Sequence, residues 1–218
     1  MATSGANTRS EYLHLVDVYL PIAAAVFALV TMVLIGFLVR YRARPGDGRR
    51  PSRRSESNTV EGVYVAVLAG VAAFLVFISL HTETKVDPVA KKAALHVRVI
   101  GAKWLWRFQY SGTNVIQGTI NGRARLVVPA GRTIVFDGTS LDVIHDFWIP
   151  RMNYQHQIFP DKVETWDMLF PKPGVYPGEC AWFCGLYHQN MHFDVVAVAP
   201  SRFTAWLRTR IGERGRPA

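Results

Sequence analysis

Two long runs of uncharged residues constrain the fold of this 218-residue chain more than any other feature of its sequence. The first run extends from Val18 to Val39 and the second from Gly62 to Leu80. A helix of roughly 20 apolar residues crosses a hydrocarbon core of about 30 Å, and charge-free runs of this length are rare in soluble domains. We therefore predict two transmembrane helices, at residues 18–39 and 62–82.

The segment that joins the two runs, residues 40–61, is strongly basic, because seven arginines face only Asp47 in its first part. Basic loops remain on the cytoplasmic side of a membrane, so the N-terminal tail, residues 1–17, and everything after the second run are expected outside. A cleaved signal peptide is an alternative for the first run. The acidic residues Glu11 and Asp17 precede that run, however, where a signal peptide has basic residues.

The exported part of the chain reads as a series of short strands. After a polar linker, residues 83–95, apolar or alternating segments of four to eight residues are separated by Gly, Pro and Asn up to residue 200. This spacing is typical of an all-β sandwich or barrel. Residues 201–218 are expected to form a short amphipathic helix and a tail, since Phe203, Trp206, Leu207 and Arg210 recur at helical spacing.

The charge of the exported part argues against nucleic-acid binding. The whole chain has a formal net charge of +9, but beyond residue 82 there are 17 basic and 11 acidic residues, which leaves only +6. This mild excess is not concentrated in a basic run, and the basic loop is too short and confined to bind a nucleic acid.

The stretch GECAWFCGLYHQNM concentrates soft metal ligands. Both cysteines of the chain, Cys180 and Cys184, lie in it together with His188 and Met191, in the pattern C-x-x-x-C-x-x-x-H-x-x-M. Thiolate, imidazole and thioether are the donors that copper selects. We therefore predict a copper site in this loop.

Two other interpretations of this loop stay open on chemical grounds. Two cysteines in an exported domain often form a disulfide. A structural zinc site could instead use both cysteines, His188 and the upstream His145, although zinc has no use for Met191. Donor chemistry alone favours copper without excluding either alternative.

Several motifs together resemble cytochrome c oxidase subunit II and its dinuclear copper domain, which is called CuA. They are D-V-x-H-x-F-x-x-P around His145, C-x-x-x-C-G-x-x-H-x-x-M from Cys180, and W-x-W-x-F-x-Y from Trp104, and the resemblance extends over the two spans and the basic loop. It implies a cupredoxin-like sandwich or barrel over residues 96–200. The protein would be a two-pass component of a bacterial plasma membrane with its copper domain on the outer face.

The resemblance also implies a role for each ligand. Cys180 and Cys184 would bridge two copper ions, His145 and His188 would each bind one copper, and two weak axial contacts would come from Met191 and from the backbone carbonyl of Trp182. Asp146, directly after His145, is expected to orient that ring or another nearby group.

Electrons would enter at the exposed Trp104, whereas Trp106, Phe108 and Tyr110 of the same segment are expected in the core. Glu61, at the inner end of the second span, resembles a position at the mouth of a proton path in subunit I. The resemblance gives this chain no catalytic residue of its own.

The function implied is that of the electron-accepting subunit of a cytochrome c oxidase in the respiratory chain. It would receive electrons from a cytochrome c or a similar donor and pass them to haem in subunit I, where oxygen is reduced and protons are pumped. Trp182 stands where most members carry a glutamate that helps to hold magnesium, which brings this magnesium site into doubt. A copper-containing nitric oxide reductase subunit is therefore an alternative, and a membrane-anchored copper-binding protein is a weaker one.

The donor is expected to differ from a basic cytochrome c. The family's acidic patch follows the aromatic run, but here the segment after Tyr110 reads SGTNVIQGTINGRAR. Such residues would not steer a strongly basic protein toward Trp104. An acidic, neutral or tethered donor fits this sequence better.

Overall fold

The computed structural model describes residues 8–42, 56–86, 89–113, 115–118 and 122–214. Two compact units form: Leu13–Glu83 is one, and Met1–Tyr12 together with Thr84–Ala218 is the other. Most of the predicted basic loop, together with residues 1–7, 87–88 and 215–218 of the predicted tails and linker, lies outside the described residues.

The first unit contains most of helix α1 (Thr8–Arg40) and of helix α2 (Asn58–Val86), both of which are longer than the apolar runs that predicted them. Both are long and apolar enough to cross a membrane, and their most apolar windows are unburied within the chain. Large apolar side chains such as Phe27 and Phe77 are exposed. The Tyr19 hydroxyl donates to the Leu75 carbonyl at 2.9 Å and joins the two helices. This pair of helices suits a two-pass membrane protein.

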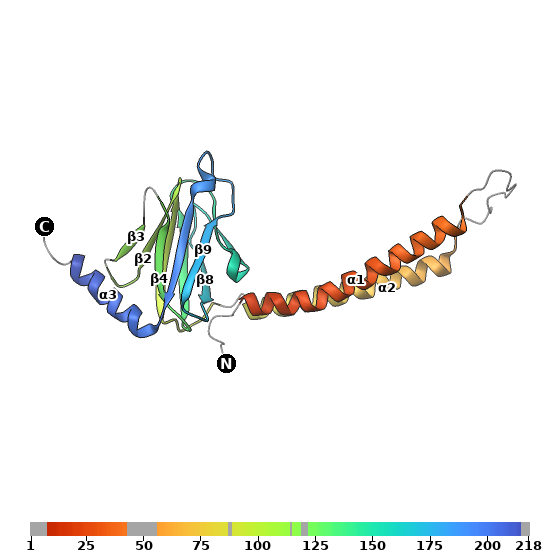
Figure 1. The fold of residues 1–218 in the computed structure, drawn as a ribbon, viewed down its shortest axis with the longest axis horizontal. Helices are drawn as coiled ribbons and strands as arrows, with labels where there is room; N and C mark the ends of the chain where they lie inside the picture. Colours follow the sequence, from red (N-terminus) through yellow and green to blue (C-terminus); the bar gives the residue numbers. More distant parts are fainter. Residues whose placement is uncertain (1–7, 43–55, 87–88, 114, 119–121, 215–218) are drawn as a thin grey trace. The chain divides into compact units, whose positions relative to one another are not determined.

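The second unit is a sandwich of two five-stranded sheets (Figure 1). One sheet has the strand order β3-β2-β1-β5-β8 and the other β4-β10-β9-β6-β7, which confirms the predicted all-β domain. The strands are β1 (Leu95–Ala102), β2 (Leu105–Tyr110), β3 (Ile116–Gly118), β4 (Ala124–Pro129), β5 (Thr133–Ser140), β6 (His145–Ile149), β7 (Tyr154–Ile158), β8 (Glu164–Leu169), β9 (Gly174–Cys180) and β10 (His192–Val198). The pairs β1/β5 and β4/β10 are parallel, while the other neighbouring pairs are antiparallel.

The core between the sheets is rich in aromatic rings, because inward positions alternate with exposed ones along strands such as β1. Trp106, Phe108 and Tyr110 are buried as predicted. Phe147 stacks on Phe193 with ring centroids 4.5 Å apart, and Trp106 meets Phe193 edge to face at 5.3 Å. These large rings form a rigid floor beneath the loop that carries the cysteines.

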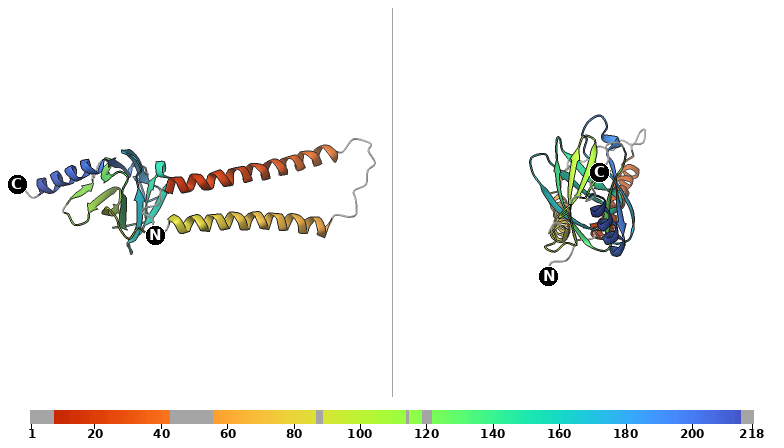
Figure 2. Two further views of the ribbon diagram at one scale, coloured as in Figure 1. Left: turned by 90° about the horizontal axis from the view of Figure 1, so that it is seen from below. Right: turned by 90° about the vertical axis from the view of Figure 1, so that its left-hand side faces the viewer.

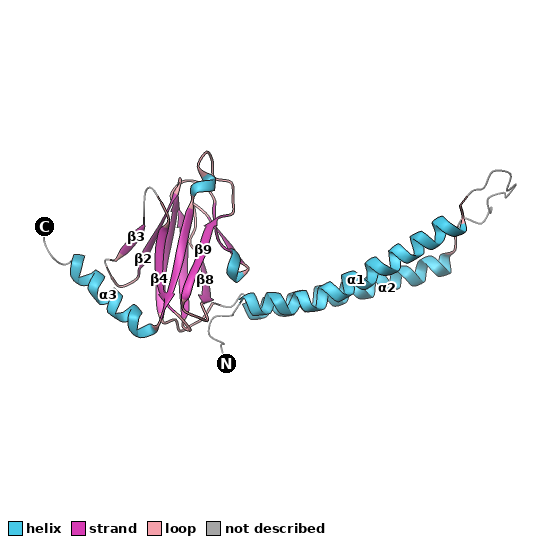
Figure 3. Cartoon of the chain, in the orientation of Figure 1, coloured by secondary structure: helices cyan, strands magenta, loops and turns pink. Residues whose placement is uncertain are grey.

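Helix α3 (Pro200–Arg214) follows β10 and confirms the predicted C-terminal helix (Figure 3). Phe203 is buried, and Trp206 packs against Tyr110 with ring centroids 5.3 Å apart. The left view in Figure 2 shows how its turns extend beyond the strands of the sandwich. The apolar side of α3 therefore closes the edge of the sandwich near β2 and β4.

Candidate metal centre

The loop between β9 and β10 brings most of the predicted ligands together. Cys180 ends β9, His188 opens the short 3-10 helix η2 (His188–Asn190), and Met191 directly precedes β10. The Cys180 amide donates to the Met191 carbonyl at 3.0 Å, so the loop starts and ends at neighbouring positions of two antiparallel strands. The eleven peptide units from Cys180 to Met191 therefore form a closed loop, which brings the ligand side chains close together.

His145 reaches the same spot from another part of the chain, because β6 pairs with β9. This histidine begins β6 and is fully buried. The close approach of β1 requires a glycine: a Cβ on Gly101 would lie 2.9 Å from Cδ2 of His145. Gly101 thus leaves room for the imidazole ring at the edge of the core.

The sulfur and nitrogen atoms converge in a regular arrangement. The two thiol sulfurs lie 3.9 Å apart, and both cysteines are free. Nδ1 of His145 lies 3.8 Å from the Cys180 sulfur, and Nδ1 of His188 lies 3.5 Å from the Cys184 sulfur. Donors bound at roughly 2.0–2.3 Å to a shared ion are separated by distances of this order. Among the described residues, His145, Cys180 and Cys184 could therefore hold a metal ion.

Two weaker donors complete the cluster. The Met191 sulfur lies 3.9 Å from the Cys184 sulfur, and the backbone carbonyl of Trp182 accepts a hydrogen bond from the Cys180 thiol at 3.2 Å. The indole Nε1 of Trp106 donates to the Met191 carbonyl at 3.2 Å, which fixes Met191 from the core side. Each thiol therefore lies beside one imidazole nitrogen and one weaker metal-ligating atom: the Trp182 carbonyl oxygen for Cys180 and the Met191 sulfur for Cys184.

Asp142 orients the His145 ring, a role that was not predicted. Its carboxylate lies 2.9 Å from Nε2 of His145, so that the neutral ring donates from Nε2 and turns Nδ1 toward the sulfur atoms. Burial, with smaller contributions from Lys103 and His188, lowers the pKa of His145 despite the contact with Asp142, which keeps the ring neutral. The sequence signal for this role was the position of Asp142 three residues before His145 in the D-V-x-H motif.

Asp146 instead binds another group. Its Oδ2 accepts from Nε2 of Gln155 at 2.7 Å, while its Oδ1 is buried without a partner in the described part of the chain. Burial raises the pKa of Asp146 despite the Gln155 hydrogen bond. Of the two predicted alternatives, Asp146 therefore contacts another nearby group, Gln155 on β7, and Asp142 is the residue that orients the His145 ring.

Burial also controls the state of the thiols. It raises the pKa of Cys184 to about 12 and, in the same direction, the pKa of Cys180. Both cysteines are therefore protonated at neutral pH in the metal-free protein, and they would release protons when they bind a metal as thiolates.

Trp104 lies beside the ligand loop and contacts it directly. Its indole Nε1 donates to the Cys184 carbonyl at 3.3 Å, and its ring meets Tyr187 edge to face with centroids 4.8 Å apart. Gly185 has a φ of +115°, and a Cβ there would lie 3.3 Å from Cζ2 of Trp104. Glycine therefore lets the loop approach the indole closely.

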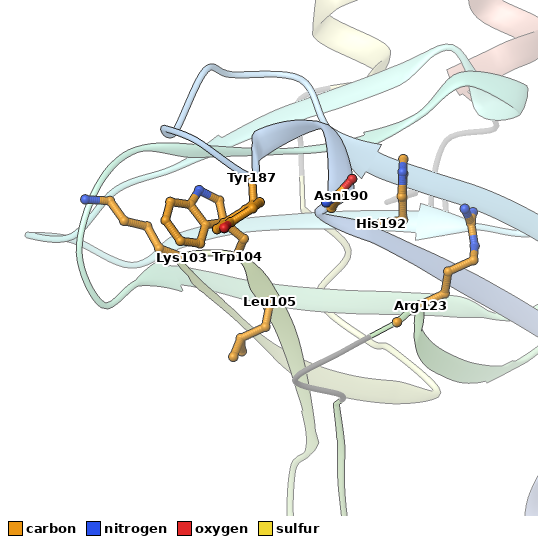
Figure 4. Close-up of a pocket in the computed structure, with 8 residues that line it drawn as sticks. Lys103, Trp104, Leu105, Arg123, Tyr187, Asn190 and His192 are labelled. Atoms are coloured by element: carbon orange, nitrogen blue, oxygen red, sulfur yellow. The ribbon is translucent and has the colours of Figure 1, made fainter.

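A hollow of about 640 Å³ opens beside this pair of rings (Figure 4). Lys103 and Arg123 lie on its walls, with His192 and Asn190 between them. Arg123 is paired with Asp194 at 2.9 Å, and His192 with Glu179 at 3.4 Å. None of the described residues that line the hollow is acidic.

The outer side of the ligand loop is apolar and open. Phe183 and Leu186 expose 78% and 76% of their surface, and Trp182 and Tyr187 are also exposed. Adjacent exposed apolar side chains of this size are typical of a surface that contacts another protein.

Glu61 lies in the other unit, in the first turn of α2. Its carboxylate accepts a hydrogen bond from the Ser57 amide at 3.4 Å. The negative charge of this carboxylate also interacts favourably with the positive N-terminal end of the helix dipole. It is thus not one of the clustered donors, and its predicted proton-path role stays a prediction.

Comparisons with known proteins agree with these features. Residues 115–198 match the family described as "Cytochrome C oxidase subunit II, periplasmic domain". The chain is 25% identical over 202 residues to "Cytochrome c oxidase subunit 2" of Alkalihalophilus pseudofirmus, which covers 88% of this chain and 57% of that protein. It is 38% identical over 100 residues to "Probable cytochrome c oxidase subunit 2" of Mycobacterium leprae, or 43% of this chain and 28% of that protein.

A solved structure supports the fold. The crystal structure of the periplasmic domain of subunit II of cytochrome oxidase from Bradyrhizobium japonicum matches with a TM-score of 0.50 and 22% identity. That match covers 57% of this chain and 98% of the other. The match covers 57% of the length of the Alkalihalophilus protein and 28% of the length of the Mycobacterium leprae protein, so the chain spans only part of these relatives.

Proposed function

We propose that this chain, which is similar to cytochrome c oxidase subunit 2 proteins, is the electron-accepting subunit of a haem-copper oxidase. In this proposal a cytochrome c or a similar donor delivers electrons at Trp104, and haem in subunit I receives them for the reduction of oxygen. The helix pair would anchor the chain in a bacterial plasma membrane, with the copper domain on the outer face. The chain itself would carry out no bond chemistry.

The arrangement of donors carries this proposal. Two thiols 3.9 Å apart, each beside a different imidazole nitrogen, are donors that would hold a pair of metal ions. Zinc in a tetrahedral site would leave Met191 and the Trp182 carbonyl without a role. The proposed ligands are His145, Cys180, Cys184, His188, Met191 and the carbonyl of Trp182.

The surrounding residues would keep this site rigid and dry. When bound, a copper pair would take up and release single electrons. Asp142 fixes one imidazole, Trp106 fixes the Met191 backbone, and the packing of Trp104 against Tyr187 limits the movement of the loop. Small rearrangement is what rapid electron transfer requires, and it depends on such supporting contacts.

Metal analysis and electron paramagnetic resonance of the full chain in detergent test the proposal. We expect two coppers per chain and a mixed-valence signal delocalised over both. Cys180→Ser and Cys184→Ser should abolish that signal, because each removes a shared ligand. One copper, or zinc, per chain would contradict the proposal.

A matched histidine pair provides the control. His145→Gln should lose the dinuclear signal, whereas His96→Gln should retain it, since His96 is an exposed residue of β1. Trp182→Ala should also retain copper, because only its backbone carbonyl is a proposed ligand. Loss of copper in the His96 variant would point to general unfolding instead.

One observation keeps a nitric oxide reductase subunit as the second candidate: an exposed Trp182 replaces the glutamate expected by resemblance. The large subunit that purifies with the chain discriminates between the candidates. A complex that reduces oxygen supports the oxidase, and one that reduces only nitric oxide supports the second candidate. A chain that purifies alone with one copper would favour a membrane-anchored copper-binding protein.

A further inference from the structure

A second groove, of about 330 Å³, lies between α3 and the outer face of the β4/β10 sheet, away from the proposed ligands. Three arginines line it: Arg125, Arg202 and Arg210. Trp206 and three valines, Val127, Val196 and Val198, contribute apolar surface, and Gln117 adds an amide. The groove thus combines cationic walls with an apolar floor.

Secondary structure explains why the arginines converge. On β4, Ala124 and Leu126 point into the core, so Arg125 between them points outward. On α3, residues 202, 206 and 210 are four apart and share one face of the helix. Two distant segments therefore bring guanidinium groups to the same groove.

The described lining of the groove is positively charged. None of the described residues that line it is acidic. Asp194 is the register partner of Arg125, but its carboxylate accepts from Arg123 at 3.0 Å. The first turn of α3 contains no acidic residue, and Arg202 adds positive charge near the positive end of the helix dipole. An anion would be stabilised at this position.

We propose that this groove binds a phosphate-bearing small molecule that also has an apolar or aromatic part. Guanidinium groups donate paired hydrogen bonds that match phosphate oxygens. The indole of Trp206 and the valines would contact the remainder of the ligand. Both a nucleotide and a phospholipid headgroup region have this chemistry, and the groove volume is in the range of small-molecule sites.

Calorimetric titration of the full chain in phosphatidylcholine nanodiscs tests the proposal with three probes: pyrophosphate, ATP and water-soluble dihexanoyl phosphatidylglycerol. We expect ATP or the lipid to bind more tightly than pyrophosphate. Binding of ATP alone identifies a nucleotide as the source of phosphate, and binding of the lipid alone identifies a headgroup. No measurable heat with any probe at about 1 mM overturns the proposal.

Matched arginine variants of α3 separate a site from general charge attraction. Arg202→Gln should weaken binding about tenfold, because one charge-assisted contact is lost, whereas Arg208→Gln on the same helix should not. Arg125→Gln repeats the test on β4 and is independent of helix stability. The proposal of a specific binding site is contradicted if Arg202→Gln and Arg208→Gln weaken ligand binding equally. It is also contradicted if pyrophosphate binds as tightly as the larger probes.

Discussion

Asp142 connects the proposed metal ligand His145 to the backbone beside Trp104. One carboxylate oxygen binds the His145 ring, and the other accepts from the Lys103 amide at 2.7 Å. Burial alone would raise the pKa of Asp142, but the hydrogen bonds from Lys103, His145 and Val143 outweigh it and lower the pKa. A single carboxylate thus supports both the metal site and the segment where electrons are proposed to enter.

We expect Asp142→Asn to weaken copper binding by roughly 10–100-fold, the usual effect of removing a residue that orients a ligand. The amide offers one acceptor, so it cannot serve both the ring and the Lys103 amide. Chelator competition on the full chain measures the affinity. Asp137→Asn is the control, because the carboxylate of Asp137 accepts from the Thr165 hydroxyl and is not bound to a proposed ligand in the described contacts, and equal weakening there would contradict the role of Asp142.

Copper loading should release protons, since burial raises the pKa of both thiols well above neutrality. The free protein binds these protons and the loaded protein does not, so apparent copper affinity must rise with pH. Titrations at pH 7 in buffers of different ionisation enthalpy should give about two protons per chain. The Cys180→Ser variant should release fewer. Affinity that is independent of pH between 6 and 8 would show that the thiols are already ionised.

Tyr187 should help to position Trp104, because its ring packs edge to face against the indole. Tyr187→Phe keeps the ring and should behave like the original protein. Tyr187→Ala should slow electron delivery by a donor and speed hydrogen exchange of the Trp104 indole, whose Nε1 binds the Cys184 carbonyl. Equal behaviour of the two variants in both measurements would leave Tyr187 without this role.

At the scale of elements, the two sheets are joined by a buried hydroxyl. The Tyr110 hydroxyl on β2 donates to the Val127 carbonyl and accepts from the Val127 amide on β4, each at 2.8 Å. Desolvation raises the pKa of Tyr110 strongly, so the group is neutral at all physiological pH values. These two bonds hold the edge of the sandwich against which α3 packs.

Tyr110→Phe should therefore lower the free energy of unfolding by about 1–3 kcal/mol, because it leaves the partly buried amide and carbonyl of Val127 without these hydrogen bonds. Denaturant unfolding of the full chain, followed by the signal of the β domain, measures the change. Tyr187→Phe removes an exposed hydroxyl and should change stability by less than about 0.5 kcal/mol. A similar loss in both variants would mean that the hydroxyl bridge contributes little.

At the scale of the whole molecule, the surface around Trp104 bears on which kind of protein would be the proposed electron donor. Exposed apolar side chains of the ligand loop adjoin a hollow whose described lining has lysine, arginine and histidine but no acid. The chain beyond residue 82 carries a formal charge of +6. A donor with an apolar contact zone and acidic or neutral surroundings fits this surface better than a basic one.

We expect Trp104→Ala to slow reduction by an acidic cytochrome by orders of magnitude, with copper content and docking affinity nearly unchanged. A basic cytochrome c should be a poor donor at any ionic strength, because it lacks complementary charge. Stopped-flow oxidation of both cytochromes by the purified complex tests this. Fast, salt-sensitive oxidation of the basic protein that survives in the variant would contradict both expectations.

The sequence by itself determined the parts of this protein that depend on neighbouring residues. Charge-free runs predicted α1 and α2, alternation predicted the strands, and the spacing from Cys180 to Met191 brought four soft donors into one loop. Hydropathy, strand periodicity and ligand spacing are local properties, so one chain is enough to read them. The match to a known motif then added His145 to the ligand set.

Only the tertiary structure decided how distant segments meet. The pairing of β6 with β9 sets His145 beside Cys180, and the turn before β6 gives ring orientation to Asp142 and not to Asp146. Strand register and helix packing likewise create the Trp104–Tyr187 pair and the arginine groove beside α3. These contacts depend on which strands pair and on the direction of each side chain, and neither is contained in the spacing of residues along the chain.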